Sequence, residues 1–302
     1  MHRRHALKLA ATLPLAATAL PTSAAPAASP IEPKFKLPFA PHVGTFQQHA
    51  GENILDQISW AAERGFTAWE DNGMPNRSPE EQTAIGELLA KKSMRMGVFV
   101  ANKINWSEPT LTQGPGQHRE EFLAAARDAV EVAKRCGAKW MTVVPGFVDL
   151  RLEPFYQFAN VLETLKQGAA ILEPHDLVMV LEPLNYRDHP GLFLTKAAQA
   201  YAMCKAVDSP ACKILFDVYH QQIQEGNLIP NIDAAWDEIA YFQLGDNPGR
   251  KEPGTGEINY ANVIRHIHHK GYGGIYGMEH GNSREGLAGE LAVVEAYRRL
   301  DV

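Results

Sequence analysis

One pattern repeats along most of this 302-residue chain. A short apolar or β-branched run ends in polar residues, and a stretch with apolar residues at every third or fourth position follows. The apolar runs are 39–46, 66–71, 96–100, 140–144, 177–181, 213–216, 239–244 and 274–278. Eight strand–helix units in about 265 residues fit one closed barrel of parallel strands. We therefore expect an α/β fold, a single (β/α)8 barrel of the TIM type over residues 39–302.

The intervening stretches carry helix signals. The helices are expected at 53–64, 79–93, 119–136, 155–172, 196–206, 260–269 and 287–300, and a further helical stretch after the sixth strand ends near Glu238. Ser78, followed three residues later by Glu81, predicts a capping box at the start of the second helix. An open, doubly wound sheet would also alternate strands and helices. No G-x-G-x-x-G turn follows the first strand, which argues against a dinucleotide-binding fold.

The first thirty residues differ from the rest. Arg3 and Arg4 precede an apolar stretch, Leu9–Leu20, and small residues follow near Ala24. This order is typical of a secretory signal, and the paired arginines resemble the twin-arginine type, which exports folded proteins. We expect a signal peptide at 1–28, a linker at 29–38, recognition by the twin-arginine export machinery and a periplasmic location. A frayed basic tail would not explain the apolar run.

The charge balance narrows the partners. The net charge is −6, and loss of the signal would remove basic residues and no acidic ones. A chain this acidic is a poor binder of phosphate backbones, so we expect no nucleic-acid partner. No other stretch is long enough to span a membrane. The three cysteines are expected to be buried, and although a Cys204–Cys212 disulfide is conceivable, nothing in the sequence demands it. The sequence does not indicate the oligomeric state.

Polar side chains end each of the last four expected strands: Glu182, Asp217, Gln243 and Glu279. In a TIM-type barrel the chemistry is built at these carboxyl ends, and strand alternation turns all four side chains inward. Three carboxylates in one mouth would repel each other unless a cation lay between them. An all-oxygen donor set suits Mg²⁺ or Mn²⁺ better than Zn²⁺. The alternative is that some of these residues cap helices or pair with an arginine.

Three segments resemble a known family. They are Leu181–Asn185 (LEPLN), Phe216–His220 (FDVYH) and Gly245–Tyr260 (GDNPGRKEPGTGEINY). Together they are similar to hydroxypyruvate isomerase, and more broadly to the xylose-isomerase-like sugar isomerase and epimerase barrels. The resemblance runs over most of the chain after the signal and is sharpest from Val180 onward. The long loop is specific to the hydroxypyruvate isomerase branch, whereas the whole superfamily shares the strand-end carboxylates.

The resemblance implies roles for individual residues. It makes Glu182, Asp217, Gln243 and Glu279 the ligands of one divalent metal ion, with Glu182 and Glu279 also the acid/base pair that flanks the substrate. His220 and Arg250 match positions that contact substrate oxygens. Gln243 favours the hydroxypyruvate isomerase branch, because many sugar epimerases have histidine there. Alternatively, Arg250 could pair with Asp246 or Glu252 in its own loop, and His220 could be a buried hydrogen-bonding residue.

The chain departs from the family in its first half. Trp69–Gly73 and Asn102–Trp106 do not follow the isomerase pattern, and these loops shape the substrate pocket. Phe46, Trp69 and Trp106 could form an apolar wall over a sugar ring or could pack in the core. Members of this branch are usually cytoplasmic, whereas this chain carries an export signal.

The expected function is a divalent-metal-dependent isomerase or epimerase of a small hydroxy-carbonyl compound or sugar. The reaction would proceed by proton abstraction beside a carbonyl through a metal-stabilised enediolate. One alternative is an exported lyase that cleaves 3-keto-glycosides by β-elimination with the same metal and glutamate pair. Another is a non-catalytic sugar-binding barrel, although binding alone needs no opposed bases. A metal-dependent endonuclease is less consistent with the sequence, because it would need a histidine-rich metal cluster and a basic groove, and this acidic sequence indicates neither.

Overall fold

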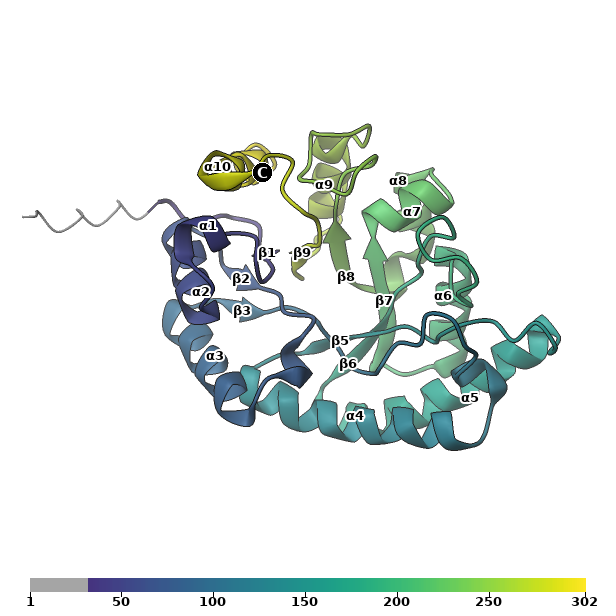
Figure 1. Ribbon diagram of the computed structural model, residues 1–302. Helices are drawn as coiled ribbons and strands as arrows, with labels where there is room; N and C mark the ends of the chain where they lie inside the picture. The colour runs from purple at the N-terminus through teal and green to yellow at the C-terminus, as the bar shows by residue number, and fades with distance from the viewer. Residues whose placement is uncertain (1–31) are drawn as a thin grey trace, which may run out of the picture. The chain divides into compact units, whose positions relative to one another are not determined.

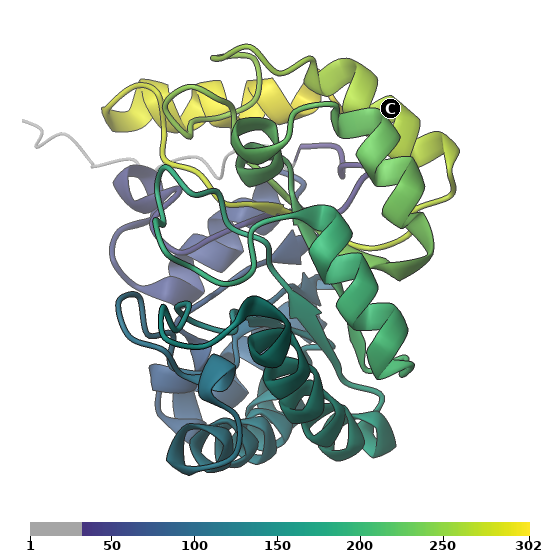
Figure 2. The same ribbon diagram turned by 90° about the vertical axis from the view of Figure 1, so that its right-hand side faces the viewer.

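The computed structural model describes residues 32–302, which form a barrel of parallel strands surrounded by helices (Figures 1 and 2). The strands are β1 (Phe39–Pro41), β2 (Ala68–Trp69), β3 (Arg95–Met96), β4 (Phe99–Val100), β5 (Trp140–Val143), β6 (Val178–Leu181), β7 (Cys212–Asp217), β8 (Ile239–Leu244) and β9 (Tyr276–Met278). The α-helices are α1 (Gln47–Ala50), α2 (Ile54–Glu63), α3 (Pro79–Lys92), α4 (Gln117–Cys136), α5 (Pro154–Leu172), α6 (Ala197–Val207), α7 (Val218–Gln224), α8 (Leu228–Ala235), α9 (Tyr260–His269) and α10 (Gly286–Arg298). Four single 3₁₀ turns complete the set: η1 (Met74–Asn76), η2 (Leu111–Gln113), η3 (Glu173–His175) and η4 (Trp236–Glu238).

The strands pair in parallel around the barrel. Seven of them follow the order β1-β9-β8-β7-β6-β5-β4, and β2 pairs with β3. The Glu70 amide donates to Pro41 O at 2.9 Å, and a parallel bridge between His42 and Glu70 joins β2 to the end of β1. The strand order and the helices around it confirm the predicted (β/α)8 barrel.

The third strand, which the sequence predicts as one continuous strand over 96–100, is divided in two. It is interrupted between β3 and β4, where Gly97 donates from its backbone to Trp69 O at 2.7 Å. A Cβ at Gly97 would overlap the hydroxyl oxygen of Tyr241 from across the barrel. The missing side chain therefore lets the backbone approach β2 and leaves space for Tyr241, at the cost of a regular strand.

The segment before β1 belongs partly to the barrel. The expected signal peptide at 1–28 lies outside the described residues, as does the start of the expected linker. Phe35 and Leu37, inside that linker, are buried against the core, and two aspartate oxygens of Asp301 accept the amides of Lys36 and Leu37. Residues 35–38 therefore pack on the domain. Within residues 32–302, none of the helices combines the length and the apolar character that crossing a membrane requires.

Two apolar layers hold the barrel together. The inside is filled by Ala40, Ala68, Val98, Val178, Val180, Leu215, Tyr241 and Ile275. A larger layer lies between the strands and the helices, and all three cysteines are buried there or beside it as free thiols. The Cys204–Cys212 disulfide that the sequence allowed is not formed. Because the interior is packed, polar chemistry is confined to the ends of the strands.

Helix α3 shows how local signals set the outer layer. Ser78 accepts from the Glu81 amide and Glu81 accepts from the Ser78 amide, so the predicted capping box is confirmed. Gly86 on the same helix faces α4, and a Cβ there would overlap Arg135 O and approach Cys136 Cα to 2.9 Å. This glycine therefore fixes how closely the two helices pack.

Gly86→Ala should destabilise the domain. In a helix, alanine is favoured over glycine by about 1 kcal/mol, but here the overlap with α4 should dominate and cost about 1–3 kcal/mol net. Denaturant unfolding followed by circular dichroism measures the difference. Gly273→Ala is the matched control, because a Cβ there meets nothing within 4 Å. An increase in stability for Gly86→Ala would show that the helices are not in close contact at this point.

Candidate active site

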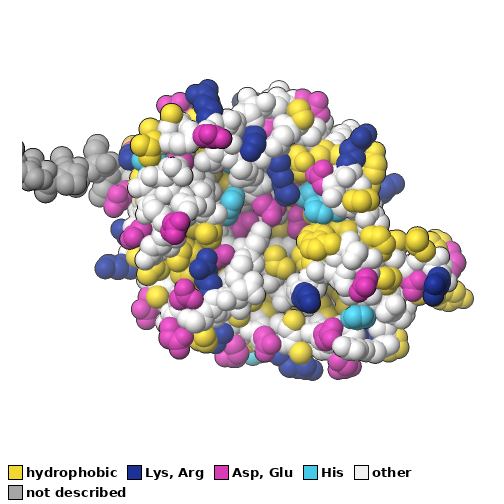
Figure 3. Space-filling model, in the orientation of Figure 1, with side chains coloured by type: hydrophobic (Ala, Val, Ile, Leu, Met, Phe, Trp, Pro, Cys, Tyr) yellow, Lys and Arg dark blue, Asp and Glu magenta, His cyan; other side chains and the backbone are white. Residues whose placement is uncertain are grey.

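The four strand-end residues expected to share a site lie at one mouth of the barrel. Glu182 directly follows β6, Asp217 ends β7, Gln243 lies in β8 and Glu279 directly follows β9. In the space-filling view, acidic and histidine side chains gather in the central hollow of this face (Figure 3). The parallel sheet brings these residues together because all its strands end at the same rim.

Two of the expected ligands lie close enough to share an ion. One oxygen of Glu182, one of Asp217 and a ring nitrogen of His220 lie within 4.8 Å of one another. Asp217 is already held, since Oδ1 caps α7 by accepting from the Tyr219 amide at 2.8 Å. Asp217 therefore caps a helix, as one of the alternatives considered from the sequence proposed. Glu182 has no such role: within residues 32–302, the only basic side-chain nitrogen within 4 Å of its carboxyl group is His220 Nε2, at 3.9 Å.

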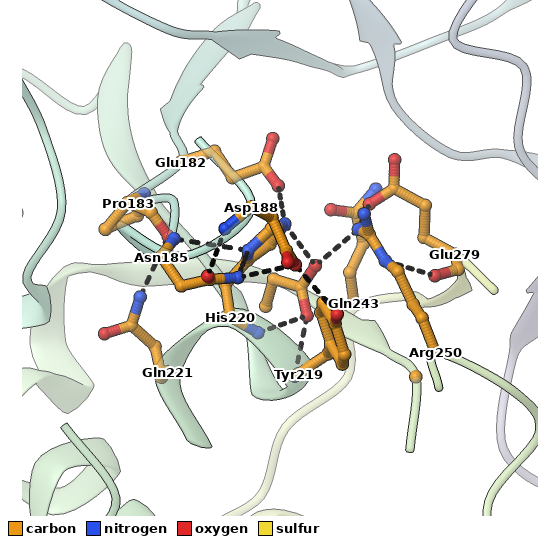
Figure 4. A network of polar contacts seen from close by, with 12 residues as sticks. Glu182, Pro183, Asn185, Asp188, Tyr219, His220, Gln221, Gln243, Arg250 and Glu279 are labelled. Carbon is orange, nitrogen blue, oxygen red and sulfur yellow. Dashed lines mark hydrogen bonds and ion pairs between the residues drawn. The ribbon is translucent and has the colours of Figure 1, made fainter. Parts of the chain in front are cut away.

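Arg250 joins the two sides of the mouth (Figure 4). Its Nη2 donates to Asp217 Oδ2 at 3.0 Å and to Glu279 Oε2 at 2.7 Å, and its Nε donates to the Glu279 carbonyl at 3.2 Å. The arginine does not pair with Asp246 or Glu252, the alternatives considered from the sequence. Its face also lies over the Tyr219 ring, with Cζ 4.9 Å from the centroid.

The loop that presents Arg250 is organised by its own acidic residues. Asp246 accepts the amides of Gly254 at 2.7 Å and Ile258 at 3.1 Å, and Glu252 accepts from the Ser283 amide at 2.8 Å. Arg250 itself has a positive φ of 49°. The acidic residues of the loop therefore fix its backbone, and the arginine side chain is left to face the barrel mouth.

Burial and mutual repulsion raise the pKa of the carboxyl groups in the mouth. Desolvation and the charges of Glu279 and Asp217 raise the pKa of Glu182 well above its ordinary value. Desolvation also raises the pKa of Glu279, although Arg250 opposes that shift. One guanidinium is thus too little positive charge for this many carboxyl groups, which is the situation that a bound divalent cation relieves.

Glu70 is the site residue that the sequence reasoning missed. It follows β2 and is fully buried, and burial together with the charge of Glu279 raises its pKa to about 8. Tyr241 Oη donates to its Oε2 and Gln243 Nε2 donates to its Oε1, both at 2.8 Å. Glu70 ends its strand as Glu182 ends β6, so the same signal could have found it. Asn72 was missed as well, and its Nδ2 donates to Glu279 Oε1 at 3.0 Å.

His220 is a fully buried, neutral ring with one free nitrogen. Its Nδ1 accepts from the backbone amide of Asn185 at 3.3 Å and lies 2.7 Å from Asn185 Nδ2. Because Nδ1 is the acceptor, the proton of the neutral ring is on Nε2. Burial lowers the pKa of His220 to about 4, and Nε2 has no hydrogen-bond partner among residues 32–302. The N–H therefore points into the mouth as an available donor.

The proposed aromatic wall is only partly present. Phe46 and Trp69 are fully buried and belong to the core. Trp106 is half exposed and stacks on His189 with the ring centroids 5.0 Å apart, and His189 lies 5.5 Å from the His220 ring. These rings form a surface that leads from the buried His220 to the outside.

His280 fixes the end of β9 next to Glu279. Its ring stacks on Tyr297, its Nε2 lies 2.8 Å from Tyr297 Oη and its Nδ1 lies 3.0 Å from Gly281 O. A neutral ring satisfies both contacts, since Nδ1–H can donate to the carbonyl while Nε2 accepts from the tyrosine. Burial lowers the pKa of His280 to about 3, so the ring stays neutral.

Comparison with known proteins places the chain in a family. Residues 58–301 match the family model described as "Xylose isomerase-like TIM barrel". The chain belongs to this family. It is 34% identical to hydroxypyruvate isomerase of Escherichia coli over 61% of this chain and 70% of the relative. It is 30% identical to 2-oxo-tetronate isomerase of Cupriavidus necator over 83% of this chain and 95% of the relative.

A solved structure of a Brucella melitensis protein described as an AP endonuclease, family 2, shares the fold. Its TM-score is 0.75 at 24% identity, and the match covers 88% of this chain and 99% of that one. The family and the resemblance expected from the sequence are therefore confirmed, and this chain is a homologue of isomerases.

Arg250→Met should destabilise the metal-free protein. The change leaves Asp217 and Glu279 in a mouth with too little positive charge, and we expect a loss of about 2 kcal/mol, since the arginine remains partly open to water. Thermal unfolding in the presence of a chelator measures it. Lys251→Met is the matched control, because Lys251 makes no ion pair within the described part of the chain. Equal stability of the two variants would contradict the counter-charge role.

His280 should make the protein sensitive to acid. In the unfolded chain the His280 ring is protonated below about pH 6.5, whereas in the folded protein its pKa is about 3. Between these two pH values the unfolded state binds one more proton, so the free energy of unfolding falls as the pH falls. In His280→Gln this slope should be shallower by up to about 1.4 kcal/mol per pH unit. Tyr297→Phe, which removes the hydroxyl on Nε2, should flatten it partly. Urea unfolding at several pH values tests this, and unchanged slopes would refute it.

Proposed function

We propose that this chain is a divalent-metal-dependent isomerase or epimerase of a small hydroxy-carbonyl compound or sugar, as its hydroxypyruvate isomerase and 2-oxo-tetronate isomerase relatives suggest. The observation that carries the proposal is the buried carboxyl cluster itself. Glu182, Asp217 and Glu279 converge on one mouth with Arg250 as their single counter-charge among residues 32–302.

The residues present fit a divalent cation. Gln243 Oε1 is a buried acceptor without a hydrogen-bond partner among residues 32–302, and Glu182 is uncapped. Glu182, Asp217, Gln243 and Glu279 would hold the ion, and carboxylate and amide oxygens suit Mg²⁺ or Mn²⁺. When bound, the ion would polarise the substrate carbonyl and its neighbouring hydroxyl as a Lewis acid. His220 is the other candidate ligand, but its Nε2 carries the ring proton, so we assign it to the substrate.

Proton transfer belongs to the two glutamates. Glu182 and Glu279 lie on opposite sides of the polar network (Figure 4), so that a substrate between them would be reached from both sides. One carboxylate removes the proton beside the carbonyl. In an isomerisation the other returns a proton to the former carbonyl carbon while the hydroxyl proton passes between the two neighbouring oxygens, and in an epimerisation it returns a proton to the opposite face of the same carbon. Their environments differ: Arg250 and Asn72 bind Glu279, whereas Glu182 has neither partner. This difference separates their proton affinities, as a pair with alternating roles requires.

Substrate oxygens would be held by donors already aimed into the mouth. His220 Nε2–H is the free donor on the β7 side, and the Arg250 guanidinium, still partly exposed, can reach a substrate oxygen from the loop. Arginine suits a carboxylate because of its planar fork. The half-exposed Trp106, stacked on His189, supports a substrate that extends from the buried carboxylates to the rim. The export signal and the periplasmic location remain predictions.

Solvent exchange tests the chemistry. The protein, loaded with Mn²⁺ or Mg²⁺, is incubated in D₂O with hydroxypyruvate, 2-oxo-tetronate, several ketoses and a 3-keto-glycoside. Proton NMR then follows the loss of the signal from the C–H beside the carbonyl as deuterium replaces the proton. We expect metal-dependent exchange that falls at least a hundredfold in Glu279→Gln, since a positioned acid/base contributes about 10²–10⁴-fold. Glu163→Gln, on the exposed face of α5, is the matched control and should exchange at the wild-type rate.

The product decides between related reactions. An isomer or epimer of the labelled compound supports the proposal, whereas elimination of the glycosidic group from the 3-keto-glycoside would make the chain a lyase with the same glutamate pair. If no bound compound exchanges or turns over, the two-glutamate mechanism is wrong and a sugar-binding barrel is the better reading.

A further inference from the structure

The fourth expected ligand, Gln243, is useful to a metal ion only in one of its two amide orientations. A carboxamide can turn either its oxygen or its nitrogen into the mouth, and only the oxygen can coordinate a hard cation. Gln243 is 99% buried, and its Oε1 lacks any hydrogen-bond partner within residues 32–302. A buried acceptor left open in this way needs something to hold it there, because leaving it unpaired costs free energy.

What holds Gln243 is Glu70, on the far side of its amide. Gln243 Nε2 donates to Glu70 Oε1 at 2.8 Å, so the nitrogen is turned away from the mouth and the oxygen toward it. The other carboxyl oxygen, Oε2, accepts from Tyr241 Oη at 2.8 Å. Tyr241 and Gln243 are alternate residues of β8 and share one face of the strand, which allows both to reach the same carboxyl group.

The barrel makes room for this carboxyl group at two glycines. A Cβ at Gly277 of β9 would overlap Glu70 Oε2, and a Cβ at Gly97 would overlap Tyr241 Oη. Glu70 is thus enclosed by β8, β9 and the break between β3 and β4. A side chain confined on this many sides has one position, which is what an orienting partner requires.

We propose that Glu70 is a positioning residue that fixes the carboxamide of Gln243 with its oxygen toward the metal site. This rests on the proposed metal-dependent function, and it adds to that function a residue that does not itself contact the metal or the substrate. Partners of this kind typically change metal affinity by about 10–100-fold when they are removed.

The test measures Mn²⁺ binding by electron paramagnetic resonance or calorimetry, without substrate or turnover. We expect Glu70→Leu to raise the Mn²⁺ dissociation constant at least tenfold. Glu70→Gln should stay within about threefold of wild type, because its amide oxygen can still accept from Gln243 while its nitrogen donates to Tyr241. A loss in Glu70→Gln as large as in Glu70→Leu would mean that the negative charge of Glu70 matters rather than its acceptor, and would overturn the proposal.

A double-mutant cycle shows whether Glu70 acts through Gln243. In a Gln243→Leu background, Glu70→Leu should weaken Mn²⁺ binding no further. An equal loss with and without Gln243 would show that Glu70 acts by another route. Gln82→Leu is the matched control: Gln82 is buried on α3 and bonded to Met74 O and Arg77 O, so its loss should lower the unfolding temperature but leave Mn²⁺ binding intact.

Tyr241→Phe provides a second, milder test in case Glu70→Leu does not fold. It keeps the ring that fills the barrel and removes only the hydroxyl on Glu70 Oε2, so we expect a smaller loss of about threefold to tenfold, absent in the Gln243→Leu background. If the wild type binds Mn²⁺ and neither Glu70→Leu nor Tyr241→Phe changes the affinity, the positioning role is wrong while the metal site stands. If the wild type binds no divalent ion, the proposed function itself fails.

Discussion

The site depends on one electrostatic constraint, an excess of carboxyl groups gathered in one barrel mouth, where Glu182 and Asp217 are buried and Glu279 and Arg250 are partly exposed. Transferring even one ionised carboxylate from water into such a place is costly unless something positive or a hydrogen-bond donor faces it. Arg250 supplies one charge, the amide end of α7 supplies donors to Asp217, and Asn72 supplies one to Glu279. These groups do not offset all of the carboxyl charge, and the raised pKa values of Glu70, Glu182 and Glu279 express that deficit, which the proposed divalent cation would relieve.

The loop that carries Arg250 has to be firm for this arrangement to hold. Its acidic residues accept hydrogen bonds from backbone amides, and they form no ion pair with Arg250. The sequence motif in this loop therefore combines two jobs: Asp246 and Glu252 shape the backbone, and Arg250 faces the strands. The motif alone does not distinguish these two roles, because an arginine close to two acidic residues is equally consistent with an ion pair inside the loop.

Much of the fold and part of the site could be predicted from the sequence. Periodicity located the strand–helix units, and the last four strands revealed Glu182, Asp217, Gln243 and Glu279 because each of these apolar runs ends within one residue of a polar side chain. Glu70 was missed because β2 has only two residues and Glu70 is followed directly by another acid, Asp71, which is also buried and pairs with Arg77. Alternation from the inward-facing Ala68 favours Glu70 over Asp71 as the inward acid. The contacts of Glu70 with β8, and the contact of Asn185 that sets the tautomer of His220, could not be predicted because they join distant segments.

Gly277 limits how this chain can change in evolution. The space that its missing side chain leaves is filled by the carboxyl group of Glu70. The two positions, more than two hundred residues apart, are therefore not free to vary separately: a chain with any larger residue at the first must carry a shorter one at the second. Replacing this glycine, which carries no functional group, would in this way disturb Gln243, the proposed metal ligand of β8. A search for homologues that have lost the site would therefore include this glycine beside the carboxylates.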